Sequence, residues 1–90
     1  MSKKVNIHRT FRQYTDDRGI VEVEGDNVGA CLDDLIGQFP GMKELLFDND
    51  GKLKNVIEVY VNGETAYPDE LARQVRDGDE IHLLVMLAGG

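Results

Sequence analysis

Residue types that could act as nucleophiles or metal ligands are few in this chain and far apart. Cys31 is the only cysteine, and His8 and His82 are the only histidines. Either histidine could in principle activate the Cys31 thiol as a nucleophile. However, Cys31 lies between Val28 and Leu32 in an apolar pattern of helical spacing, which indicates a packed thiol. One cysteine and two distant histidines do not form a zinc motif.

Other motifs of catalysis or cofactor binding are also missing from the sequence. It contains neither a phosphate-binding loop nor a dinucleotide-binding glycine motif. Its only serine is Ser2, beside the chain start, which argues against a serine triad. The run Asp48-Asn49-Asp50-Gly51 lacks the third ligand of a calcium loop and indicates a solvated turn. The sequence therefore predicts a protein without catalytic residues, bound metal or bound cofactor.

The chain ends in Gly89-Gly90. At a glycine content of about 7%, such an end occurs by chance in roughly one chain in two hundred. Taken alone, the pair is explained by a loose terminus without function. As a functional element, a tail without side chains can enter a narrow channel. Its α-carboxylate, with a reference pKa of roughly 3.3–3.7, is ionised and unreactive at neutral pH. It would need activation with ATP by a separate enzyme.

The segment before these glycines predicts a strand that is apolar on both faces. One face is expected to carry Ile81, Leu83, Val85 and Leu87, under a helix. The opposite face would carry His82, Leu84, Met86 and Ala88, with Tyr60 and Val56 on the same outer side. A central strand buried on both sides explains this pattern without function. The functional alternative is an exposed apolar patch for a protein partner.

The remaining elements follow from periodicity and turn residues. Alternating runs at 5–8 and 21–24 predict a hairpin. Apolar residues at helical spacing predict a helix from Val28 to Phe39, capped by Asp26 or Asn27 and ended by Pro40-Gly41. A strand at 56–61 closes in an Asn62-Gly63 hairpin turn, followed by a short partner, a helical turn within 69–75 and the last strand at 80–87. One α+β domain is expected, with a sheet covered on one face by one main helix.

The overall composition limits the partners and the compartment. Ninety residues form one small domain. The net charge of −7 argues against nucleic acid and favours a basic partner surface. No segment has the length and hydropathy of a membrane span or a secretory signal. A single cysteine excludes an internal disulfide and fits a cytoplasmic location.

The layout and the Gly-Gly end resemble the ubiquitin-like β-grasp sulfur carriers. These include the thiamin-biosynthesis carrier, the molybdopterin synthase small subunit and the cysteine-biosynthesis carriers. The resemblance covers nearly the whole chain. It is most specific at Gly51-Lys52-Leu53, at 59–64 and from Asp77 to Gly90. It implies a mixed four- to five-stranded sheet with one main helix on one face, a β-grasp domain over 1–87 and a flexible tail over 88–90.

The resemblance also implies a function. An adenylyltransferase related to ubiquitin-activating enzymes would use ATP to adenylate Gly90. A sulfur donor would convert it to a thiocarboxylate, and a sulfur-accepting biosynthetic enzyme would receive the sulfur. Gly89 and Ala88 would occupy the partner's channel, and a docking patch of Leu84, Met86, His82 and Tyr60 would lie beside it.

One departure bears on the alternatives. Ubiquitin has arginines at the positions of Met86 and Ala88, and their absence argues against lysine-directed tagging. The long connector from 42 to 55 favours the cysteine-biosynthesis type. A molybdopterin synthase small subunit, a ubiquitin-like modifier and a plain binding module remain the alternatives.

Overall fold

The computed structural model describes residues 2–85 of the chain. Its elements, in chain order, are β1 (Lys3–Ile7), the 3-10 helix η1 (Arg9–Tyr14), β2 (Ile20–Val23), α1 (Val28–Gln38), α2 (Met42–Leu46), β3 (Ile57–Val61), β4 (Glu64–Thr65), the 3-10 helix η2 (Glu70–Ala72) and β5 (Glu80–Val85). The predicted order of the strands and of the main helix is confirmed.

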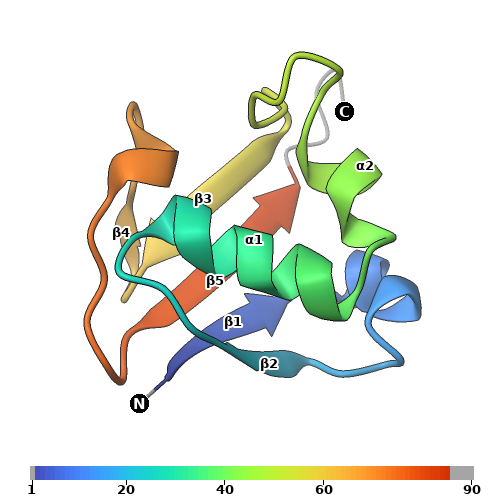
Figure 1. Ribbon diagram of the computed structural model, residues 1–90, viewed down its shortest axis with the longest axis horizontal. Coiled ribbons are helices and arrows are strands. Elements are labelled where there is room, and N and C mark those ends of the chain that lie inside the picture. Colours follow the sequence, from blue (N-terminus) through green and yellow to red (C-terminus); the bar gives the residue numbers. More distant parts are fainter. Residues whose placement is uncertain (1, 86–90) are drawn as a thin grey trace.

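The five strands form one mixed sheet in the order β2-β1-β5-β3-β4. The last strand, β5, therefore lies in the middle, parallel to β1 and antiparallel to β3. Both helices lie on one side of the sheet, with α1 crossing in front of the central strands (Figure 1). The other side of the sheet is left open within the described residues, so β5 has one covered face and one open face.

The helix α1 forms where the sequence predicts it. Asn27 has extended backbone, and its side-chain Oδ1 accepts a hydrogen bond from the Ala30 N–H at 2.7 Å. Of the two predicted caps, Asn27 is therefore the one that the structure uses. Gly29 allows close packing, because a Cβ at this position would lie 3.1 Å from the Leu71 carbonyl oxygen in η2. The glycine lowers the helix propensity of α1 at this position but lets η2 pack closely against the helix.

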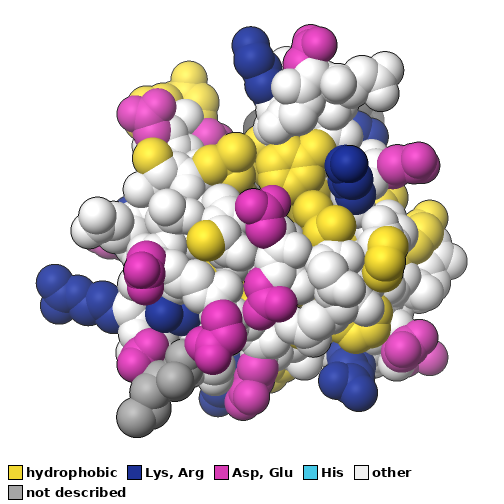
Figure 2. Space-filling model, in the orientation of Figure 1, with side chains coloured by type: hydrophobic (Ala, Val, Ile, Leu, Met, Phe, Trp, Pro, Cys, Tyr) yellow, Lys and Arg dark blue, Asp and Glu magenta, His cyan; other side chains and the backbone are white. Residues whose placement is uncertain are grey.

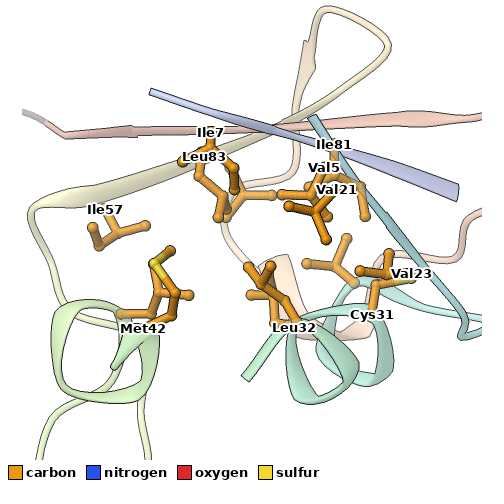
Figure 3. Close-up of a cluster of buried hydrophobic side chains, with 14 of the residues drawn as sticks. Val5, Ile7, Val21, Val23, Cys31, Leu32, Met42, Ile57, Ile81 and Leu83 are labelled. Atoms are coloured by element: carbon orange, nitrogen blue, oxygen red, sulfur yellow. The ribbon is translucent and has the colours of Figure 1, made fainter. Parts of the chain in front are cut away.

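A single core fills the space between the sheet and the helices. Its aliphatic side chains from β1, β2, β3 and β5 face Cys31 and Leu32 of α1 and Met42 of α2 (Figure 3). Ile81 and Leu83 of β5 are 0% and 1% exposed. The prediction that these two residues face the helix is confirmed.

The Asn62-Gly63 hairpin is also confirmed. Both residues have positive φ, 52° and 87°. Asparagine and glycine tolerate this conformation, which a two-residue hairpin turn requires. The Asn62 amide extends the turn across to β5, since its Nδ2 donates to Asp79 and its Oδ1 accepts from the Glu80 N–H.

Several boundaries differ from the sequence prediction. The first strand begins at Lys3, whose ammonium lies 3.2 Å from the Asp77 carboxylate. Val56 precedes β3 and is 40% exposed, so it does not share a strand face with Tyr60. The 3-10 helix η1 was not predicted, because only one of its residues, Phe11, is buried and its sequence shows no apolar periodicity.

Candidate functional site

The candidate site is the open side of β5, the strand that leads toward the chain end. Ile7, the last residue of β1, pairs with Leu83, so β1 ends before β5 does. Beyond that point only β3 continues beside β5, and its Ile57 pairs with Val85. The last described residues of β5 are thus fixed on one side and accessible from the other.

Three residues of the predicted docking patch lie together on this open face. His82 pairs with Tyr60 of β3, and Leu84 follows two positions later on the same face. All three side chains are half-buried. The strand register therefore brings together residues that lie more than twenty positions apart in the sequence.

The open face is more polar than the alternating pattern predicted. Leu84 pairs with Glu58, and His82 is flanked on its other side by Asn6. Toward the start of β5, Glu80 pairs with Lys4. Among the described residues, the apolar part consists of Leu84, the ring of Tyr60 and, farther out on β2, Ile20, which pairs with Asn6 and is 52% exposed. Over residues 2–85, β1 and β3 place polar side chains beside those of β5, while Met86 and Ala88, which were also expected on this face, lie outside the described residues.

His82 has a carboxylate neighbour on its own strand. Its Nε2 lies 3.5 Å from Glu80 Oε2, and both side chains are partly exposed. The two residues are two positions apart and so share a face. This contact places a carboxylate beside the imidazole on the open face.

A groove of about 430 Å³ lies beside Leu84 and His82, at the end of β1. His8, Arg9 and Arg12 line it, and among residues 2–85 no carboxylate does. Arg12 is held by its Nε, which donates to the Ile7 carbonyl at 3.2 Å. This basic groove was not predicted as part of the site. The sequence signal was the run His8-Arg9 with Arg12, but only the parallel pairing of β1 with β5 brings it to Leu84.

The opposite side of the molecule is acidic. Figure 2 shows Asp and Glu side chains gathered over the region of α1 and β2. The net charge of −7 is therefore unevenly distributed, with cationic groups beside the end of β5. A partner that contacts both regions needs a mixed surface rather than a uniformly basic one.

Cys31 is a structural thiol, as predicted. It is fully buried, and its Sγ lies 3.6 Å from the Gly25 carbonyl oxygen. Burial raises the pKa of the Cys31 thiol, which keeps it protonated. It points into the core under the sheet, whereas His82 lies on the open face and His8 caps η1. The structure does not bring the cysteine and the histidines together.

The acidic turn after α2 also has a structural explanation. Asp48 Oδ1 accepts hydrogen bonds from the N–H groups of Asp50 and Lys52 at 2.9 and 3.0 Å. The predicted turn is confirmed. Over residues 2–85, no group of three or more His, Cys, Asp or Glu side chains is placed to hold a metal ion. In the same residues, no helix is both long and apolar enough to cross a membrane.

Four predicted site residues, Met86, Ala88, Gly89 and Gly90, lie outside the described residues. Their roles as docking, channel and modified residues stay predictions. So does the division of the chain into a domain over 1–87 and a tail over 88–90.

Comparison with known proteins gives the family. The model of the ThiS family matches residues 5–90, nearly the whole chain. This chain belongs to the ThiS family. The sulfur carrier protein CysO of Mycobacterium tuberculosis is 34% identical to it over 93 residues, covering 100% of both chains. Small archaeal modifier protein 1 of Haloferax volcanii is 39% identical over 71 residues, covering 78% of each chain.

The solved structures agree with this family. A chain of the Amycolatopsis orientalis BexX/CysO complex superposes with a TM-score of 0.88 at 34% identity, covering 98% of this chain and 99% of that one. The fold of this ThiS-family chain is thus the ubiquitin-like β-grasp fold that the sequence resemblance implied. Its relatives are carriers or modifiers rather than catalysts, which agrees with the lack of catalytic motifs in its sequence.

Proposed function

We propose that this ThiS-family chain is a sulfur carrier that is adenylated and then thiocarboxylated at Gly90. It donates the sulfur to a biosynthetic enzyme of the cysteine or homocysteine type, or to one that makes another sulfur metabolite. The observation that carries the proposal is the position of β5, a central strand with an open face that leads toward the Gly-Gly end. The match to CysO over the full length of both chains supports the same function.

The chemistry takes place in the partner enzymes. In an adenylyltransferase, a carboxylate oxygen of Gly90 attacks the α-phosphorus of ATP and pyrophosphate leaves. Sulfide supplied by the donor then attacks the acyl carbon and AMP leaves, which produces the thiocarboxylate. This chain supplies the carboxylate and the docking surface. ATP is a substrate of the partner and not a cofactor of this chain.

Docking uses the open face together with the tail. Leu84 and Tyr60 supply the apolar contact, with Met86 continuing the same alternation, and His82 adds a polar group between them. Ala88 and Gly89 occupy the partner's channel. The basic groove at Arg9 and Arg12 fits an acidic segment of the partner beside this contact. Charge complementarity of this kind accelerates association more than it strengthens binding.

Two related functions remain as alternatives. The same thiocarboxylate chemistry operates in a molybdopterin synthase small subunit, which would form a stable complex with its large subunit. The similarity to small archaeal modifier protein 1 supports a second alternative, a ubiquitin-like modifier joined to other proteins. The solitary buried Cys31 fits a cytoplasmic location for each of these functions.

Intact-mass measurement tests the proposal directly. The chain is incubated with an adenylyltransferase that acts on ThiS-family carriers, ATP and a sulfide donor. We expect a mass increase equal to the exchange of one oxygen for sulfur, located in the C-terminal peptide. A variant lacking Gly90 is the matched control and should gain nothing. If cell extracts contain high-mass conjugates of the chain but no thiocarboxylated chain, the modifier function is favoured. An unchanged mass in the complete reaction would refute the carrier function.

A further inference from the structure

Arg12 is held in one orientation although the residue is exposed. Its Nε donates to the carbonyl of Ile7 at 3.2 Å, where β1 ends and η1 follows (Figure 1). The guanidinium also lies against Gly19, because a Cβ added to that glycine would stand 3.0, 3.1 and 3.3 Å from Nη2, Cζ and Nε. Nearly equal distances to three atoms of one plane place the flat face of the guanidinium over Gly19. The carbonyl and the glycine together fix the group.

This arrangement leaves the outer end of the Arg12 guanidinium unpaired. Within residues 2–85, neither Nη group has a hydrogen-bond or ion-pair partner. Two such groups form a planar fork that matches the two oxygens of a carboxylate. An ordinary surface arginine loses side-chain entropy when it forms such a pair. Arg12 is already ordered in the free protein, so it loses less of that entropy on binding.

The groove at the end of β1 places an apolar contact beside this fork. Leu84 of the docking patch lines the same groove as Arg12. His8 adds a donor, because the Thr10 N–H occupies its Nδ1 at 3.2 Å and Nε2 therefore carries the hydrogen when the ring is neutral. Arg9 adds a second cation. The groove thus offers positive charge and hydrogen-bond donors together with an aliphatic surface.

We propose that Nη1 and Nη2 of Arg12 bind one carboxylate of a partner enzyme, while an apolar side chain of the same partner segment lies against Leu84. The partner segment would accordingly present Asp or Glu next to an apolar residue. This proposal deepens the sulfur-carrier function and rests on it for the identity of the partner, which is an enzyme that receives the tail. Arg12 would then determine the position of that segment, whereas Arg9 would add attraction without a fixed geometry.

Two other occupants fit the groove less well. A second copy of the chain would bring a carboxylate to Arg12, but each copy carries a net charge of −7, so two copies repel each other at long range. A free inorganic anion such as phosphate would pair with the guanidinium but would leave Leu84 beside it without an apolar contact. An acidic protein segment satisfies both the charge and the apolar surface.

NMR of the full chain tests the proposal. The probe is the acetylated and amidated pentapeptide Gly-Leu-Glu-Leu-Gly, and its control is Gly-Leu-Gln-Leu-Gly, which has the same shape without the charge. In the free protein, the bond to Ile7 should make the Nε–H of Arg12 exchange with water more slowly than that of Arg18. Saturating glutamate peptide should shift the Arg12 Nε–H and the Leu84 amide together. We expect the glutamine peptide to bind roughly three- to ten-fold more weakly.

A charge-conserving variant identifies the fork. Arg12→Lys keeps the positive charge but replaces the fork by a single ammonium, and it should reduce the preference for the glutamate peptide to less than about two-fold. Arg18→Lys is the matched control, because Arg18 is exposed in the same segment and does not line the groove. It should leave the preference unchanged. The peptide comparison itself uses the unchanged chain, so the test stands even where a variant unfolds.

Four results would each overturn the proposal. The first two are no shift with millimolar glutamate peptide and a full preference retained in Arg12→Lys. The third is an equal response to inorganic phosphate and to the glutamate peptide at matched ionic strength, which would indicate a plain anion site. The fourth is a shift of the Arg12 resonance that grows with protein concentration, which would indicate a second copy. None of these measurements depends on thiocarboxylation of Gly90, so the intact-mass experiment tests the sulfur-carrier function separately.

Discussion

Replacing Leu84 by aspartate separates docking from folding. Full burial of a leucine side chain is worth roughly 1.5–3 kcal/mol, and Leu84 is only half-buried, so its loss costs about 1–1.5 kcal/mol. The new carboxylate would lie opposite Glu58, which adds roughly 0.2–1 kcal/mol of repulsion. The sum remains well below the stability of about 5–15 kcal/mol that is typical of native domains. The Leu84→Asp variant should therefore fold.

The neighbouring position provides the contrast. Leu83 is 1% exposed and points into the core. Aspartate there loses the whole burial energy and places a charge among apolar side chains, at a cost of roughly 5 kcal/mol or more. We expect Leu83→Asp to be largely unfolded. Two adjacent substitutions of the same chemistry should thus give opposite results, because they lie on opposite faces of one strand.

The assay combines thermal unfolding with adenylation. By circular dichroism, Leu84→Asp should lower Tm by roughly 5–15 °C and keep a cooperative transition. Its kcat/KM in pyrophosphate release by the adenylyltransferase should fall about ten-fold or more, as expected for a residue at the centre of an interface. Leu84→Asn removes the apolar contact without adding a charge, and its kcat/KM should fall nearly as far as that of Leu84→Asp. Unfolding of Leu84→Asp, or full adenylation of it, would refute the placement of the docking patch.

Three further predictions follow from the described residues. Asn27→Ala removes the acceptor of the Ala30 N–H and should destabilise the domain by about 1 kcal/mol in urea unfolding, and an unchanged midpoint would contradict the cap. The Arg76 backbone N–H and the Asn62 amide lower the pKa of Asp79, so its stabilising contribution should be complete above the unfolded pKa of about 3.8 and vanish at lower pH. The difference in unfolding free energy between wild type and Asp79→Asn, measured by urea unfolding, should accordingly be present at pH 7 and shrink on acidification. A difference that stays constant with pH would exclude the Asp79 charge as its cause. Cys31 should resist a thiol reagent in the native state and react at the rate of unfolding, and immediate labelling would show that the thiol is not buried.

The helix and the two faces of β5 were predictable from local patterns. Val28, Leu32 and Leu35 are spaced so that they form one apolar face of a helix, and this spacing can be read without knowing the fold. Alternation at Ile81 and Leu83 likewise determines which face of β5 is covered. The Asn62-Gly63 turn depends on the conformational preferences of its own two residues. Each of these predictions concerns residues that are close in sequence.

Features that depend on strand pairing were not predictable in this way. The open face of β5 takes its polar character from Asn6 and Glu58, which belong to different neighbours in the sheet. The 3-10 helix η1 has no periodic signal, since Phe11 alone is buried. Its arginines reach the site only because β1 runs parallel to β5 and ends earlier.

The sequence by itself determined the family, the order of the elements and the covered face of the last strand, because these follow from short-range periodicity and from the motif that ends in Gly89-Gly90. Only the tertiary structure decided which side chains surround Leu84 and that Arg9 and Arg12 lie beside it. Strand register is a long-range property: the sheet joins segments more than fifty residues apart, and no local pattern encodes which residue of one strand lies beside which residue of another.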